Sequence, residues 1–168
     1  MKPTSLFSLA LPLLVVALTA TGAAKVSVKL ADAQGKSVGT VTLSEHKKGV
    51  EIKAHLENLP PGEHAVHFHR EAKCDAPDFK SAGPHFNGAS GHADHAGMPM
   101  GDIPDFSLIV GADGTGHAIV VAPNVSMGAD DKSVFSNGGT AIVIHAVAGG
   151  TDSAAPPRIA CGVISKPQ

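Results

Sequence analysis

The sequence contains no tryptophan and no tyrosine, so its six phenylalanines are its only members of the Phe, Trp and Tyr group. A hydrophobic core must therefore be built mainly from aliphatic side chains, since hydrophobic residues make up 43% of the chain and aromatic ones only 4%. Basic runs are also missing, and the formal net charge is −2. The sequence gives no sign of a nucleic-acid partner, because such partners require clustered Lys and Arg.

Long hydrophobic runs are missing too, apart from one near the N-terminus. Lys2 precedes an apolar run over residues 6–18, and small residues follow at 22–24. This order is typical of a secretory signal peptide cleaved near residues 22–24. A retained membrane anchor is the weaker alternative, because the run is shorter than the roughly 20 residues of a membrane span. We expect residues 1–24 to be a signal peptide and residues 25–168 to form one domain, periplasmic or secreted and free of the membrane.

Cysteine is scarce, with only Cys74 and Cys161 in the whole chain. In the oxidising compartment that a signal peptide implies, a single disulfide is the default expectation, and two free thiols are the weaker alternative. A disulfide that closes so long a loop would contribute roughly 4–5 kcal/mol to stability.

Helical periodicity is absent from the sequence, and alternation of apolar and polar residues takes its place. Turn residues separate the alternating runs, and the GADGTG segment at 111–116 is typical of a hairpin connection. Short alternating runs at this spacing predict an antiparallel β-sandwich or barrel. The expected strands lie near 26–30, 41–43, 50–56, 64–69, 106–110, 117–121 and 140–147.

Two long segments, residues 70–105 and 148–158, interrupt this alternation. Loops of this length in a compact domain are usually functional or disordered. The first contains HFNGASGHADHAGMPMGD at 85–102, with three histidines and two aspartates. This wealth of metal-ligand residue types favours function over disorder.

The HAVHFH segment at 64–69 predicts a pair of converging imidazoles. On a strand, His67 and His69 share one face about 6.6–6.8 Å apart, while Val66 and Phe68 take the other. His145 ends another apolar strand and could supply a third imidazole. Three histidines on a solvated sheet face are the alternative. An all-imidazole site suits Cu, Zn, Fe or Ni, and disfavours Ca and Mg.

Five motifs follow one another along the chain: HAVHFHREAKC at 64–74, SAGPHFN at 81–87, GD at 101–102, GGTAIVIHA at 138–146 and PRIACGVI at 157–164. Together they resemble the exported bacterial copper–zinc superoxide dismutases. The resemblance implies an all-β fold, an antiparallel Greek-key β-sandwich or barrel of immunoglobulin-like architecture with two long functional loops. It extends through most of residues 25–168.

The resemblance also implies roles for individual residues. His85 would bridge copper and zinc through its two ring nitrogens, Arg158 would attract the superoxide anion, and Cys74 and Cys161 would form the intrachain disulfide. His64 would be structural. The implied copper ligands are His67, His69, His85 and His145, whereas His46, His55 and His117 match no ligand and are expected at the surface.

The implied mechanism is redox cycling of copper. Cu(II) would oxidise one superoxide to dioxygen, and Cu(I) would reduce a second one to hydrogen peroxide. The bridging His85 would release reduced copper, take up a proton and deliver it in the second half-reaction.

The zinc loop departs from the family pattern. Asp102 matches the family's aspartate and His92 lies close to its first zinc histidine, but Pro99 occupies the usual place of the second. His95 is the available substitute, which predicts a zinc site of His85, His92, His95 and Asp102 that fits tetrahedral coordination. A copper-only protein is the alternative. A second departure favours it, because the aspartate that often orients both metal-site histidines is replaced by Gly149, with Asp152 the nearby substitute.

Together these features predict an exported superoxide dismutase that uses copper and zinc, with superoxide as its small-molecule substrate and no nucleic-acid or membrane partner. A homodimer is compatible with this prediction. The alternative is a non-catalytic copper- or zinc-binding protein on the same fold, for buffering or delivery. Arg158 discriminates against it, because a metal buffer does not need an arginine that attracts anions.

Overall fold

The computed structural model describes residues 25–90, 97–148 and 156–167, which form nine strands and two short 3-10 helices. The signal peptide predicted for residues 1–24 lies outside the described residues, as do His92, His95, Gly149 and Asp152. No helix in the described part of the chain is long and apolar enough to cross a membrane. The strands are β1 (Lys25–Asp32), β2 (Ser37–His46), β3 (Gly49–Leu56), β4 (Gly62–His64), β5 (Val66–His69), β6 (Leu108–Val110), β7 (Gly116–Ala122), β8 (Thr140–His145) and β9 (Arg158–Ile164).

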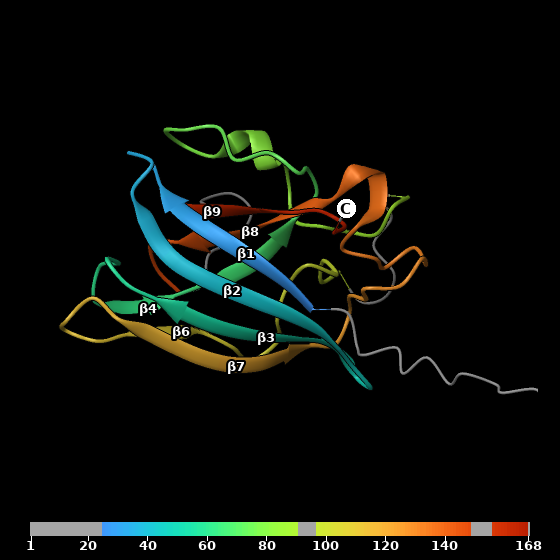
Figure 1. Ribbon diagram of the computed structural model, residues 1–168, viewed down its shortest axis with the longest axis horizontal. Coiled ribbons are helices and arrows are strands. Elements are labelled where there is room, and N and C mark those ends of the chain that lie inside the picture. The colour runs from blue at the N-terminus through green and yellow to red at the C-terminus, as the bar shows by residue number, and fades with distance from the viewer. Residues whose placement is uncertain (1–24, 91–96, 149–155, 168) are drawn as a thin grey trace, which may run out of the picture.

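The nine strands form one antiparallel sheet in the order β4-β6-β7-β3-β2-β1-β9-β8-β5. Its two edge strands, β4 and β5, are separated in sequence only by Ala65. The sheet therefore curls until its edges nearly meet, which gives an almost closed barrel (Figure 1). The predicted all-β class is confirmed.

Aliphatic side chains from the inner face of the sheet fill the barrel, as the lack of Trp and Tyr requires. Strand alternation directs every second residue inward, as in β1, where Val26, Val28 and Leu30 are buried between exposed neighbours. Phe68 and Phe86 supply the largest fully buried side chains. This inner core keeps the histidine-bearing face of β5 on the outside of the barrel.

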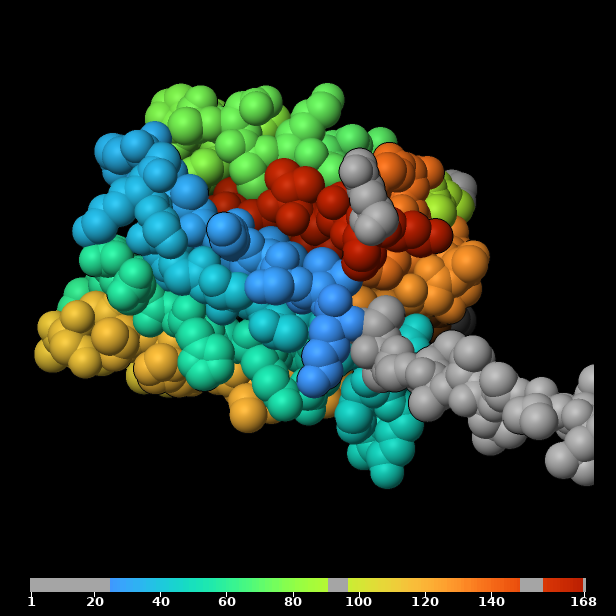
Figure 2. Space-filling model, in the orientation of Figure 1, coloured from blue at the N-terminus to red at the C-terminus, as the bar shows by residue number. Residues whose placement is uncertain are grey.

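A second, smaller cluster lies on that outer face. Ala141 and Val143 of β8 pack with Phe79 and Ala82 from the loop after β5, and with Cys161 of β9. The same loop contains the short helix Lys80–Ala82. Figure 2 shows the loop, in green, packed along the side of the molecule formed by β9, in red. The functional residues can therefore be held between the barrel wall and this loop.

The strand predicted over 64–69 is interrupted at Ala65. The N–H of Ala65 donates to the carbonyl of Val147, and the carbonyl of Ala65 accepts from the N–H of His145. Ala65 is thus hydrogen-bonded to residues at and just beyond the end of β8. On either side of it, β4 pairs with β6, and β5 pairs with β8. The GADGTG hairpin is confirmed, since Val110 pairs with Gly116.

Candidate metal centre

Four histidines converge on the outer face of β5 and β8. His67 and His69 come from alternate positions of β5, and His145 ends the neighbouring strand β8. His85 comes from the long loop, which forms an isolated antiparallel bridge to β5 between His69 and His85. One ligand atom from each of the four lies within 4.8 Å of the others. The structure therefore brings together the residues that the resemblance assigns to copper.

The hydrogen bonds of two histidines direct their Nε2 atoms toward the centre. Nδ1 of His69 lies 2.9 Å from the carbonyl oxygen of Gly83, and Nδ1 of His145 lies 3.1 Å from that of Pro156. Because a carbonyl oxygen only accepts, these Nδ1 atoms carry the proton and Nε2 keeps its lone pair. Those two Nε2 atoms are 3.3 Å apart. Oxygen partners of this kind commonly orient metal-ligating histidines.

In His67 the ring nitrogen without a hydrogen-bond partner among the described residues is Nδ1, which is buried. An orphaned buried polar atom is costly, because it has given up water without gaining another partner. A metal ion among the four rings would satisfy it. The all-imidazole donor set suits copper, zinc, iron or nickel.

Burial favours the neutral form of His67, His69 and His145, which is the form that metal ligation requires. Desolvation, followed by the nearby His85, lowers the pKa of His67 to about 4. Desolvation also lowers the pKa of His69 to about 2, against a backbone hydrogen bond that raises it. The pKa of His145 is lowered too, mainly because the ring is buried.

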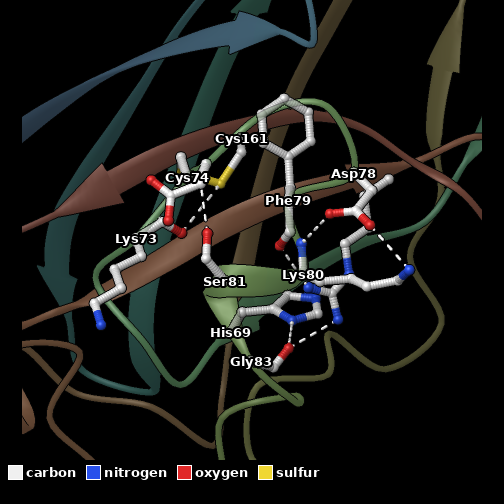
Figure 3. The surroundings of a disulfide bond; sticks show 11 residues. His69, Lys73, Cys74, Asp78, Phe79, Lys80, Ser81, Gly83 and Cys161 are labelled. Carbon is white, nitrogen blue, oxygen red and sulfur yellow. Dashed lines mark hydrogen bonds and ion pairs between the residues drawn. A yellow bond between two sulfur atoms is a disulfide. The ribbon is translucent and has the colours of Figure 1, made fainter.

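Arg158 lies directly across from His145 in the register of β8 and β9. Its Nη1 donates to the carbonyl of Phe79 at 2.7 Å, and its Nη2 donates to the carbonyl of Gly83 at 2.8 Å. The carbonyl of Gly83 thus contacts both the arginine and His69, the latter contact being visible in Figure 3. Partial burial lowers the pKa of Arg158, but a guanidinium stays charged in proteins. A fixed positive charge therefore lies beside the histidine cluster.

Asp102 is bound to the outer side of His85. Its Oδ1 lies 2.6 Å from Nδ1 of His85, and both side chains are 24% exposed. The preceding residue, Gly101, fits between Phe68 and Phe86, since it accepts from the N–H of the first and donates to the carbonyl of the second. A Cβ on Gly101 would lie within 2.2 Å of the carbonyl oxygen of Phe68. Glycine at this position lets the chain run close enough to place Asp102 against His85.

Only half of the predicted zinc set can be located. His85 and Asp102 are adjacent, whereas His92 and His95 lie outside the described residues. The zinc site remains a prediction.

The remaining histidines differ in their surroundings. Both ring nitrogens of the buried His64 face carbonyl oxygens, those of His145 at 2.8 Å and Pro60 at 2.7 Å, so neither can bind a metal. This fits the structural role that the resemblance implies. His55 and His117 are exposed and His46 is half-buried.

The predicted disulfide is present. Cys74 and Cys161 are bonded, with Cα atoms 5.7 Å apart, and the bond joins the long loop to β9 (Figure 3). Ser81 strengthens the same region, because its Oγ accepts from the N–H of Asp75.

Sequence reasoning missed the backbone groups that orient the site. The carbonyls of Gly83 and Pro156 fix two of the histidines, yet no side-chain pattern reveals a carbonyl partner. Only the position of Gly83, two residues before His85 in SAGPHFN, places it near the site in sequence.

Known proteins resemble this chain over most of its length. The family model described as copper/zinc superoxide dismutase matches residues 37–164. The copper–zinc superoxide dismutase of Caulobacter vibrioides is 38% identical, over 77% of this chain and 79% of that protein. Its counterpart in Escherichia coli K12 is 35% identical, over 94% of this chain and 98% of that protein.

Solved structures give the same picture. A double mutant of a SOD-like protein from Bacillus subtilis is similar with a TM-score of 0.73 and 32% identity, over 83% of this chain and 97% of that chain. The Cu/Zn superoxide dismutase from Brucella abortus is similar with a TM-score of 0.65 and 30% identity, over 84% of this chain and all of that one.

Proposed function

The chain belongs to the copper/zinc superoxide dismutase family, and we propose that it dismutates superoxide with copper held by four histidines. The observation that carries the proposal is the convergence of four imidazoles, with the free nitrogens facing one another beside a fixed arginine. The proposed ligands are His67, His69, His85 and His145.

Copper bound there would supply one-electron chemistry, by which one superoxide is oxidised to dioxygen and another, with two protons, is reduced to hydrogen peroxide. The protein's own contribution begins with His85. Asp102 occupies its Nδ1, which leaves Nε2 as the free nitrogen of a ring that lies against those of His67 and His69. In this orientation Nε2 is the atom that can bind metal or hold a proton inside the site. We propose His85 as the residue that moves a proton to the reduced substrate.

Arg158 is the proposed binding group for the anion. Two of its five N–H donors are used by the carbonyls of Phe79 and Gly83, which fix the guanidinium plane. The other donors remain for a small anion, and the charge raises its local concentration. This arginine also favours an enzyme over the alternative, a non-catalytic copper- or zinc-binding protein.

Replacing His145 tests the copper assignment. In His145→Ala we expect copper affinity to fall at least about 100-fold, because even partners outside the ligand shell affect it by 10–100-fold. Dismutation should be lost together with copper. Elemental analysis and an activity assay of copper-loaded protein measure both, with His46→Ala as the control histidine. Full copper content and activity in His145→Ala would remove the assignment.

We also propose that zinc binds His85, His92, His95 and Asp102, with His95 replacing the ligand missing at Pro99. The contact of Asp102 with the outer nitrogen of His85 supports this proposal, because that atom faces away from the other three histidines. Wild-type protein should hold about one zinc per chain, and His95→Ala should weaken zinc strongly while copper stays. If the wild type carries little zinc even when zinc is supplied, and His95→Ala changes neither metal content nor melting temperature, the site is copper-only.

Export is the last element of the proposal. The lysine and apolar run of residues 1–24 support a signal peptide, and the disulfide suits an oxidising compartment such as the periplasm. N-terminal sequencing of the exported protein should begin near residues 23–25. A sequence that still begins at Met1 would contradict export by cleavage.

A further inference from the structure

Two exposed histidines outside the four-histidine cluster face each other on neighbouring strands. His55 of β3 and His117 of β7 are direct partners in the antiparallel register. Their Nδ1 atoms are 3.2 Å apart, and their ring centroids are 5.2 Å apart at an interplanar angle of 64°. In the strand order, β2, β1 and β9 separate this pair of strands from β8 (Figure 1).

The separation of the two Nδ1 atoms suits a shared metal ion. Two imidazole nitrogens bound to one tetrahedral ion at about 2.0–2.1 Å lie about 3.3 Å from each other. The observed 3.2 Å therefore needs little movement of either ring. The other interpretation is a hydrogen bond between one protonated and one free nitrogen, for which 3.2 Å is at the long end of the usual range.

The charges around the pair also favour a cation. The Asp113 carboxylate interacts with His117, which contributes to lowering the pKa of Asp113 after the larger effect of hydrogen bonds from Thr115. Lys53, the preceding residue on the same face of β3, forms an ion pair with Glu51 at 3.1 Å. Its positive charge is therefore partly balanced. Exposure of both rings leaves room for water to complete the coordination of an ion.

We propose that His55 and His117 form a second metal site, which binds a divalent late first-row ion such as Ni²⁺, Zn²⁺ or Cu²⁺ through their Nδ1 atoms and water. Imidazole is the ligand type that these ions favour. The site shares no residue with the four-histidine cluster and does not depend on the proposed dismutase activity. A bound ion would link β3 to β7 across the sheet.

The test uses the full chain loaded with one equivalent each of copper and zinc, so that the proposed enzyme sites, with four protein ligands each, fill before a site with two histidines. Calorimetric titration with Ni²⁺ should show that the wild type binds one more equivalent of Ni²⁺ than the double variant His55→Ala/His117→Ala. Either single variant should bind this equivalent on the order of 100-fold more weakly, because the second imidazole acts at a high effective concentration. His46→Ala is the matched control and should keep the extra equivalent.

Melting curves provide the second readout. Added Ni²⁺ should raise the melting temperature of the wild type more than that of the double variant, since an ion that binds only the folded state stabilises it. Without Ni²⁺ the two proteins should melt alike, because both side chains are exposed. If alanine impairs folding, His55→Thr and His117→Thr place a strand-favouring residue at each position. The proposal is overturned if the wild type takes up no additional Ni²⁺, or if the double variant takes up as much.

Discussion

At the scale of single residues, replacing Arg158 tests the attraction of the substrate anion separately from metal binding. Its side chain contacts two loop carbonyls and is not among the four histidines, so Arg158→Ala should retain copper. We expect the dismutation rate to fall about tenfold or more and to depend less on ionic strength, because steering by charge is screened by salt. Stopped-flow assays at several salt concentrations measure both effects.

The matched variant is Arg158→Lys, which keeps the charge and loses the planar pair of hydrogen bonds to Phe79 and Gly83. A rate in Arg158→Lys above that of Arg158→Ala, with the salt dependence retained, assigns the effect to charge. An unchanged rate and salt profile in Arg158→Ala would mean that this arginine has no part in attracting the substrate.

Residue identities made part of the site predictable. Alternation in HAVHFH places His67 and His69 on one face, and the strand ending at His145 supplies the third ring. The pairing of His55 with His117 was not predictable, because the two are 62 residues apart and meet only through the register of β3 with β7. Both were expected at the surface, where the structure places them.

At the scale of elements, most strands were predictable because they alternate between the filled barrel and solvent. The break at Ala65 was not, since the sequence continues to alternate through it while the backbone changes partner from β6 to β8. The course of the long loop over residues 70–105 was not predictable for a related reason. Its course depends on backbone hydrogen bonds and on a close approach at Gly101, and neither follows a periodic pattern.

That close approach can be tested with Gly101→Ala. The new Cβ would lie 2.2 Å from the carbonyl oxygen of Phe68, so the backbone must move and take Asp102 away from His85. We expect a loss of roughly 2 kcal/mol in stability, which is about 5 °C in melting temperature for a domain of this size. Zinc content should also fall if Asp102 is a ligand.

Gly128→Ala is the control, because a Cβ there meets its nearest atom, Oδ2 of Asp130, at an ordinary 3.5 Å. Its melting temperature and metal content should match the wild type. Equal melting temperatures for Gly101→Ala and Gly128→Ala would show that the loop adapts without strain.

At the scale of the whole molecule, the site lies between two hydrophobic clusters. The barrel core supports β5 and β8 from inside, and the outer cluster of Phe79, Ala82, Ala141, Val143 and Cys161 holds the loop against them. The loop in turn supplies His85 and the carbonyls that fix His69 and Arg158. The architecture was predictable from strand patterns, whereas this outer layer required the three-dimensional structure.

The disulfide is the covalent part of that outer layer, and its removal is expected to affect the whole molecule. Cys74 and Cys161 are 87 residues apart, and a closed loop of this length restricts the unfolded chain by roughly 4–5 kcal/mol. Reduction of the metal-free protein should therefore lower its melting temperature by on the order of 10 °C. The double variant Cys74→Ser/Cys161→Ser should melt near the reduced wild type and should not respond to reductant. Melting curves with and without reductant measure this difference. Equal curves for the wild type, or two free thiols in its mass spectrum, would show that the bond does not stabilise the fold.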